Sequence, residues 1–143
     1  MSSNQQSYRT EDTFTVAAIQ LMPADSAVKN LENAQSLLRE AASRGADIAV
    51  LPENFAYYGQ PNISALIKGE DDEKGLAGAF LRTQAQELGI WIVGGTIPVL
   101  GCVEPVDIDR PYARSFLLNP QGERKAYYDK IHLFDADISL SKG

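Results

Sequence analysis

The sequence predicts an α/β fold built on a mixed β-sheet, and three observations lead to this fold class. A strand, an amphipathic helix and a second strand follow one another within about forty residues, which is typical of a βαβ unit with parallel strands. A further helix and an apolar strand repeat that order less cleanly. Near the C-terminal end, two strands flank a short turn that contains proline and glycine, which indicates an antiparallel pair.

The chain begins with a polar segment and a first strand. Residues 1–12 are expected to form a loose arm, and residues 13–143 are expected to belong to one domain. Phe14–Leu21 (FTVAAIQL) is rich in β-forming and small apolar residues, and Pro23 ends it. This segment is therefore predicted to be a buried strand.

A helix and a second strand follow. Asp25 and Ser26 can act as N-caps for a helix that runs to about Arg44, and Gly45 stands where a C-terminal cap belongs. Asp47–Leu51 (DIAVL) is an apolar run stopped by a proline and is predicted to be the second strand. The apolar positions of the helix recur at helical spacing and are expected to face the core: Val28, Leu31, Ala34, Leu37, Leu38 and Ala41.

The middle of the chain is predicted to contain a loop, a helix and a third strand. Residues 57–75 hold glycine, proline, asparagine and charged residues, which indicates a loop with a short helix near 63–68. A helix is expected over Gly75–Leu88, and Gly89 ends it. Ile90–Thr96 (IWIVGGT) is continuous and apolar, as in a strand that is covered on both faces.

The last predicted elements are an exposed excursion and a hairpin. Residues 98–111 carry several prolines and acidic residues, which suits a surface segment. Ala113–Leu118 and Arg124–Asp129 are expected to pair as antiparallel strands. The turn between them, Asn119–Gly122, has proline at its second position and glycine at its fourth, which fits a type I turn.

Charge and composition exclude several classes of protein. The chain has 143 residues and a formal net charge of −6 at pH 7, so no basic stripe is present to neutralise nucleic-acid phosphates. No apolar run approaches the ~20 residues of a membrane span, and the N-terminus lacks the apolar core of a signal peptide. One cysteine, Cys102, and one histidine, His132, do not make a metal-ligand set. We therefore expect no metal and a reduced, cytoplasmic setting.

Two ionisable residues follow predicted strands at matching positions. Glu53 comes just after Asp47–Leu51, and Lys130 directly follows Arg124–Asp129. Because ligands of open α/β sheets bind at the carboxyl ends of strands, we expect these side chains to converge there. A carboxylate beside an ammonium combines a general base with a cationic stabiliser, a pairing that suits acyl transfer. On spacing alone, a surface glutamate and a surface lysine stay an open alternative.

Several short sequence motifs occur in an order that is typical of one protein family. They are Ile19-Gln20 at the end of the first strand, Asn30-Leu31 early in the helix, ADIAVLPE at Ala46–Glu53, WIVGGTIP at Trp91–Pro98 and KIHLFD at Lys130–Asp135. In these motifs the chain, from about Phe14 to its last residue, resembles the carbon–nitrogen hydrolase (nitrilase-like) superfamily. Its motifs are most similar to those of the branch that contains omega-amidases and deaminated-glutathione amidases. The resemblance implies an α-β-β-α sandwich, of which this chain is expected to form the N-terminal half.

The resemblance also implies a chemistry that uses a glutamate, a lysine and a cysteine. The family's glutamate matches Glu53 and deprotonates a thiol that attacks an amide or nitrile carbon, while its lysine matches Lys130 and stabilises the tetrahedral intermediate. His132 matches a structural histidine that packs near the lysine segment. Tyr58 either lines the substrate pocket or packs in the core. No cofactor is implied, and complete family members are expected to be homo-oligomers that act on small amides or nitriles.

The nucleophile is the point at which the chain departs from the family. The family's cysteine lies C-terminal to its lysine, and none of the thirteen residues after Lys130 is a cysteine. Cys102 precedes the lysine among acidic neighbours, which disfavour a thiolate, so we leave it out of the site. We therefore interpret residues 13–143 as the N-terminal part of the domain, ended before its nucleophile and inert by itself. The alternative is a non-catalytic binding or dimerisation module of the same fold.

Overall fold

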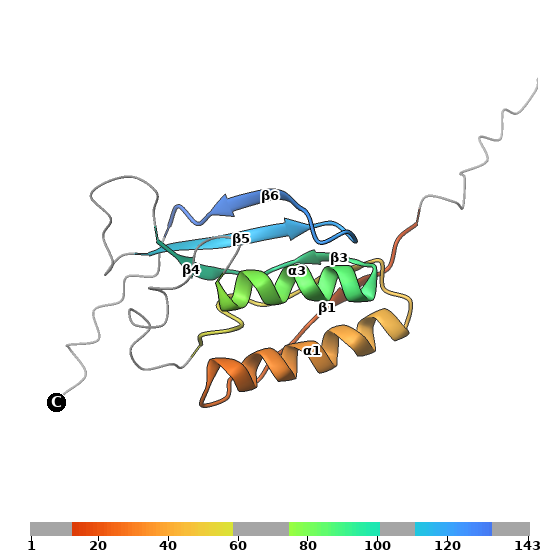
Figure 1. Cartoon of the computed structure of the whole chain (residues 1–143), viewed down its shortest axis with the longest axis horizontal. Helices are drawn as coiled ribbons and strands as arrows, with labels where there is room; N and C mark the ends of the chain where they lie inside the picture. The colour runs from red at the N-terminus through yellow and green to blue at the C-terminus, as the bar shows by residue number, and fades with distance from the viewer. Residues whose placement is uncertain (1–12, 59–74, 101–110, 133–143) are drawn as a thin grey trace, which may run out of the picture.

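The computed structural model describes residues 13–58, 75–100 and 111–132. Its elements (Figure 1) are, in chain order, β1 (Val16–Ala18), α1 (Ala27–Ser43), β2 (Ile48–Val50), α3 (Leu76–Leu88), β3 (Trp91–Val93), β4 (Ile97–Val99), β5 (Tyr112–Leu118) and β6 (Arg124–Asp129). The arm predicted over 1–12 and the short helix predicted near 63–68 lie outside the described residues.

The sheet is mixed, as predicted. β1, β2 and β3 run parallel in that order, with Val16 opposite Ile48 and Ile48 opposite Trp91. β5 is antiparallel to β3 and to β6. The turn between β5 and β6 is closed by a hydrogen bond from the Gly122 N–H to the Asn119 carbonyl (2.9 Å). The βαβ unit and the hairpin expected from the sequence are therefore both confirmed.

β4 is an element that the sequence-based prediction missed. The predicted strand over 90–96 ends early, because β3 stops at Val93. The chain returns to strand conformation only at β4, and both β3 and β4 pair with β5. Residues 98–99 thus lie in a buried strand, and the exposed excursion predicted for 98–111 is wrong there. The strand was not predicted because it contains Pro98, and proline usually marks a turn. Among the described strands, β4 pairs with β5 alone, and such an edge strand tolerates the missing N–H.

Both described helices cover the same face of the sheet (Figure 1). Right-handed crossovers between neighbouring parallel strands in the order β1, β2, β3 place α1 and α3 on one side. α1 begins at Ser26, whose Oγ accepts a hydrogen bond from the Lys29 N–H (3.2 Å), as the predicted cap requires. The core between the helices and the sheet is apolar, and its members include Leu31, Leu38, Leu81, Ile92 and Phe116.

The opposite face of the sheet is apolar but only half-buried or exposed. Across the paired strands its side chains form two rows, one of Val16, Ile48 and Trp91 and one of Ala18, Val50, Val93, Leu117 and Ala126. We call this surface the open face. Neither α1 nor α3 lies on it, so within the described part of the chain the sheet has a helical layer on one side only.

Candidate active site

Glu53 and Lys130 meet at one edge of the sheet. Glu53 follows β2 and Lys130 directly follows β6, so both side chains leave the carboxyl ends of strands. Lys130 Nζ donates a hydrogen bond to Glu53 Oε1 at 2.7 Å, across 77 positions of sequence. The Glu53 side chain is 63% exposed and that of Lys130 is 33% exposed. The structure thus brings together the two residues that the sequence singled out, and a ligand can reach both charges.

The loop that carries Glu53 is held by the segment between β3 and β4. The Asn54 N–H donates to Thr96 Oγ1 (3.0 Å), and Asn54 has a left-handed backbone (φ 53°), which asparagine tolerates better than most residues. Gly95 (φ +34°) approaches the same loop so closely that an added Cβ would overlap the carbonyl oxygen of Pro52. Only glycine allows this approach, and the approach interrupts the extended run between β3 and β4.

A buried polar residue of α1 anchors the far side of the same loop. Asn30 is 3% exposed. Its Nδ2 donates to the Ala56 carbonyl (3.0 Å), and its Oδ1 accepts from the Ala24 N–H (2.7 Å). Because both halves of the amide find backbone partners, Asn30 occupies a position on the buried helix face without an unpaired polar group. Val28, which helical spacing assigned to that face, is 60% exposed instead.

β5 fixes the position of Lys130. The Lys130 N–H donates to the Ala113 carbonyl (3.0 Å). One residue earlier, the Asp129 carboxylate accepts two hydrogen bonds from Arg114, from Nε at 2.6 Å and from Nη2 at 2.9 Å. The sequence-based prediction did not single out Arg114 or Asp129. The signal that identifies them is the strand register, because pairing of β5 with β6 places these two residues opposite each other.

A pocket of about 500 Å³ adjoins Glu53. Its other lining residues are Asn54, Tyr58, Thr96, Ile97, Pro98, Pro111, Tyr112 and Ala113. Tyr58 is 59% exposed and stands in this lining, whereas its neighbour Tyr57 is 1% exposed in the core. Mostly apolar walls with a few polar groups suit a small organic ligand whose polar end faces Glu53.

The remaining candidates from the sequence are His132 and Cys102. His132 is exposed, two residues beyond Lys130, and Cys102 lies outside the described part of the chain. Within residues 13–58, 75–100 and 111–132, no three His, Cys, Asp or Glu side chains are placed to hold a metal ion. Over the same residues, no helix is both long enough and apolar enough to cross a membrane.

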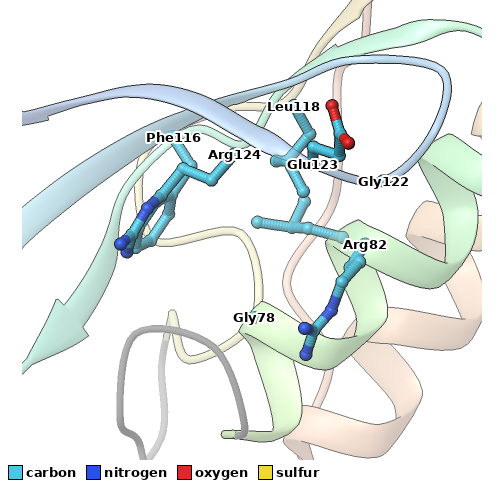
Figure 2. Close-up of a pocket in the computed structure, with 8 residues that line it drawn as sticks. Gly78, Arg82, Phe116, Leu118, Gly122, Glu123 and Arg124 are labelled. Atoms are coloured by element: carbon cyan, nitrogen blue, oxygen red, sulfur yellow. The ribbon is translucent and has the colours of Figure 1, made fainter.

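A second pocket, of about 370 Å³, lies between α3 and the β5–β6 hairpin. Figure 2 shows the charged groups of Arg82, Glu123 and Arg124 pointing in different directions, so they do not converge on one ligand position. Hydrogen bonds from the Lys125 and Asn119 side chains hold the pKa of Glu123 below its ordinary value, as in an exposed ion pair at a turn. The candidate site is therefore the Glu53–Lys130 pair.

Comparisons with known proteins agree with one another. The model of the carbon-nitrogen hydrolase family matches residues 15–142. The chain is 37% identical to the omega-amidase NIT2 of Mus musculus in an alignment of 130 residues that covers 88% of this chain and 43% of the relative. It is 31% identical to the deaminated glutathione amidase of Synechocystis sp. in an alignment of 127 residues that covers 87% of this chain and 44% of the relative. The chain thus spans less than half the length of these curated relatives.

Solved structures of the same fold give a consistent result. Saccharomyces cerevisiae Nit3, a member of the nitrilase superfamily, matches with a TM-score of 0.67 at 26% identity, over 82% of this chain and 44% of that chain. An amidase from Nesterenkonia sp. matches with a TM-score of 0.65 at 24% identity, over 85% of this chain and 44% of that chain. The α/β fold class predicted from the sequence is the class of these structures.

Proposed function

The chain belongs to the carbon–nitrogen hydrolase family, and on this premise we propose that it supplies the general base and the cationic stabiliser of an amide-hydrolysing active site. One observation carries the proposal: Lys130 Nζ lies 2.7 Å from Glu53 Oε1, beside a mostly apolar pocket. A carboxylate and an ammonium held together at strand ends provide the two groups that acyl transfer needs from its surroundings.

In the proposed reaction Glu53 moves protons and Lys130 stabilises charge. Glu53 takes the proton of a cysteine thiol, and the thiolate attacks the amide carbon to form a tetrahedral oxyanion next to Lys130. As the C–N bond breaks, the leaving nitrogen takes the proton from Glu53, and an acyl thioester is left. Glu53 then accepts a proton from water, whose oxygen attacks the thioester. The C–S bond breaks, and the leaving sulfur takes that proton back from Glu53, so the carboxylic acid and the thiol are released.

The thiol is not proposed to come from Cys102. In the family the cysteine lies C-terminal to the lysine, and the chain holds no cysteine after Lys130. The relatives are more than twice as long as the part they share with this chain. We therefore propose that residues 13–143 act as the base-and-lysine part of a catalytic domain, and that they are inactive without a part that carries the nucleophile.

The substrate that this site fits is the amide of a small carboxylic acid, without a cofactor. The pocket beside Glu53 has room for a few carbon atoms, and the exposed ring of Tyr58 is proposed to contact them. His132 is proposed to support the Lys130 segment and not to exchange protons with substrate. The names omega-amidase and deaminated glutathione amidase of two relatives support this substrate class. We propose a cytoplasmic homo-oligomer as the complete form.

The open face favours a second candidate function. Two rows of apolar side chains on one side of a sheet are an unusual surface for a protein that stays monomeric, because burying them against another layer is favourable. The second candidate is therefore a non-catalytic module that binds a second copy of this chain through the open face.

An ammonia-release assay separates the two candidates. We expect the 143-residue chain alone to release no ammonia from alpha-ketoglutaramate above the uncatalysed rate, and Cys102→Ser to leave that result unchanged. A chimera in which this chain replaces the matching 130 residues of the Mus musculus omega-amidase is expected to release ammonia. Turnover by the chain alone that is lost in Cys102→Ser contradicts the proposed nucleophile. An inactive but folded chimera, together with a stable dimer of the chain in sedimentation, supports the second candidate.

A further inference from the structure

Arg114 and Asp129 form a bidentate and largely buried ion pair. Arg114 is 8% exposed, and its guanidinium contacts both oxygens of the Asp129 carboxylate, at 2.6 and 2.9 Å. The Tyr127 ring of β6 lies 4.3 Å from Arg114 Cζ. The guanidinium is thus fixed at its edge by the carboxylate and on its face by the ring, which leaves it little freedom to move.

This ion pair lies one residue from the lysine of the candidate site. Asp129 is the last residue of β6, and the next residue, Lys130, bonds through its N–H to the carbonyl of Ala113, the neighbour of Arg114. The pair therefore fixes the point at which the chain leaves β6 and from which the Lys130 side chain extends to Glu53. We propose that Arg114 is a positioning residue, which aims Lys130 at Glu53 by holding Asp129. Its importance for catalysis rests on the proposed function, whereas the positioning itself does not.

The balance of charges explains why a cation is needed at Arg114. The Asp129 side chain is only 29% exposed, and a carboxylate in that position is costly without a cationic partner. If Arg114 is removed, the ammonium of the adjacent Lys130 becomes a competing partner for Asp129 and is drawn away from Glu53. Arg114 thus keeps Lys130 available for Glu53. A lysine in its place retains the charge but not the planar fork that fits both carboxylate oxygens.

The partner of Lys130 can be measured by NMR in the 143-residue chain labelled with ¹⁵N and ¹³C. A scalar coupling across the hydrogen bond, from Lys130 Nζ to a carboxyl carbon, identifies which carboxylate accepts the bond. We expect this coupling to Glu53 in the wild-type chain. In Arg114→Met we expect it to fall below detection for Glu53, and in Arg114→Lys we expect it to be weakened.

The double variant Arg114→Met/Asp129→Asn separates positioning from simple packing. If Arg114 acts by satisfying the Asp129 charge, removing that charge restores the coupling between Lys130 and Glu53. Arg124→Met is the matched control, because Arg124 also lies over the Tyr127 ring, at 5.6 Å, but pairs with Leu118 at the opposite end of the hairpin. This control is expected to leave the coupling unchanged.

Two results would overturn the proposal. One is a full Lys130–Glu53 coupling in folded Arg114→Met. The other is a double variant that is folded but does not recover the coupling. If Arg114→Met does not fold, the single variant Asp129→Asn carries the test, because it is expected to keep the wild-type coupling, and loss of the coupling there contradicts the account. The readout needs no turnover, so an inactive but folded chimera counts against the proposed function without touching this inference.

Discussion

Glu53→Gln in the omega-amidase chimera is expected to lower kcat for ammonia release from alpha-ketoglutaramate by a factor of about 10² to 10⁴. Glutamine keeps the size of the side chain and an oxygen that can accept the hydrogen bond from Lys130. In the wild-type chain this bond joins Lys130 Nζ to Glu53 Oε1 at 2.7 Å. It cannot accept a proton, so neither thiol activation nor water activation is assisted. Because substrate binding does not require that proton transfer, KM is expected to change far less than kcat.

The matched control for this prediction is the exposed ion pair of α1. Lys29 Nζ lies 3.0 Å from Glu32 Oε2, and both side chains are more than half exposed. Glu32→Gln removes the same charge from a comparable pair that is not beside the pocket. It is expected to leave kcat within a factor of about two, since an exposed pair contributes little to the stability of the fold. A Glu53→Gln chimera with the activity of the Glu32→Gln chimera removes Glu53 from the mechanism.

Gly95→Ala is expected to lower the free energy of unfolding by at least about 3 kcal/mol, among the larger effects of a single substitution. The new Cβ would overlap the backbone carbonyl of Pro52, and the backbone of Gly95 is left-handed (φ +34°). No flexible side chain is available to move aside, because the overlapping atom belongs to the main chain. Urea unfolding followed by circular dichroism measures the loss.

Gly45→Ala is the control that separates steric overlap from backbone conformation. Gly45 also has a positive φ of +82°, but an added Cβ there meets nothing within 4 Å. Only the conformational cost applies, so we expect a loss of about 1 kcal/mol. Equal losses for the two variants contradict the conclusion that Gly95 is required by its approach to the Glu53 loop.

Local signals were sufficient to predict α1, α3 and the β5–β6 hairpin. Ser26 caps α1 as its side-chain chemistry predicts, and Gly45 follows the helix with the positive φ that favours glycine. The turn at Asn119–Gly122 forms the hydrogen bond expected between its first and fourth residues. These features depend on residues a few positions apart, so periodicity, caps and turn residues contain the required information.

Features that depend on distant residues were only partly predictable. The position of strand ends predicted that Glu53 and Lys130 converge, but the supporting contacts of Thr96 and Arg114 require the register of paired strands. β4 was missed because Pro98 indicates a turn in the sequence. In the structure it lies in an edge strand, where proline is tolerated. Burial of a polar residue such as Asn30 is likewise decided by a partner 26 positions away and not by its place on the helix.

A double-mutant cycle on Glu53 and Lys130 tests most directly the claim that these residues form one catalytic pair. The measurement is kcat/KM of the chimera for Glu53→Gln, for Lys130→Met and for the double variant. When two residues act as a unit, the effects of their substitutions are strongly non-additive. We therefore expect kcat/KM of the double variant to be within about tenfold of that of the less active single variant. A double variant whose loss equals the product of the two single losses would show that Glu53 and Lys130 act independently, and near wild-type activity in either single variant would contradict the proposed function itself.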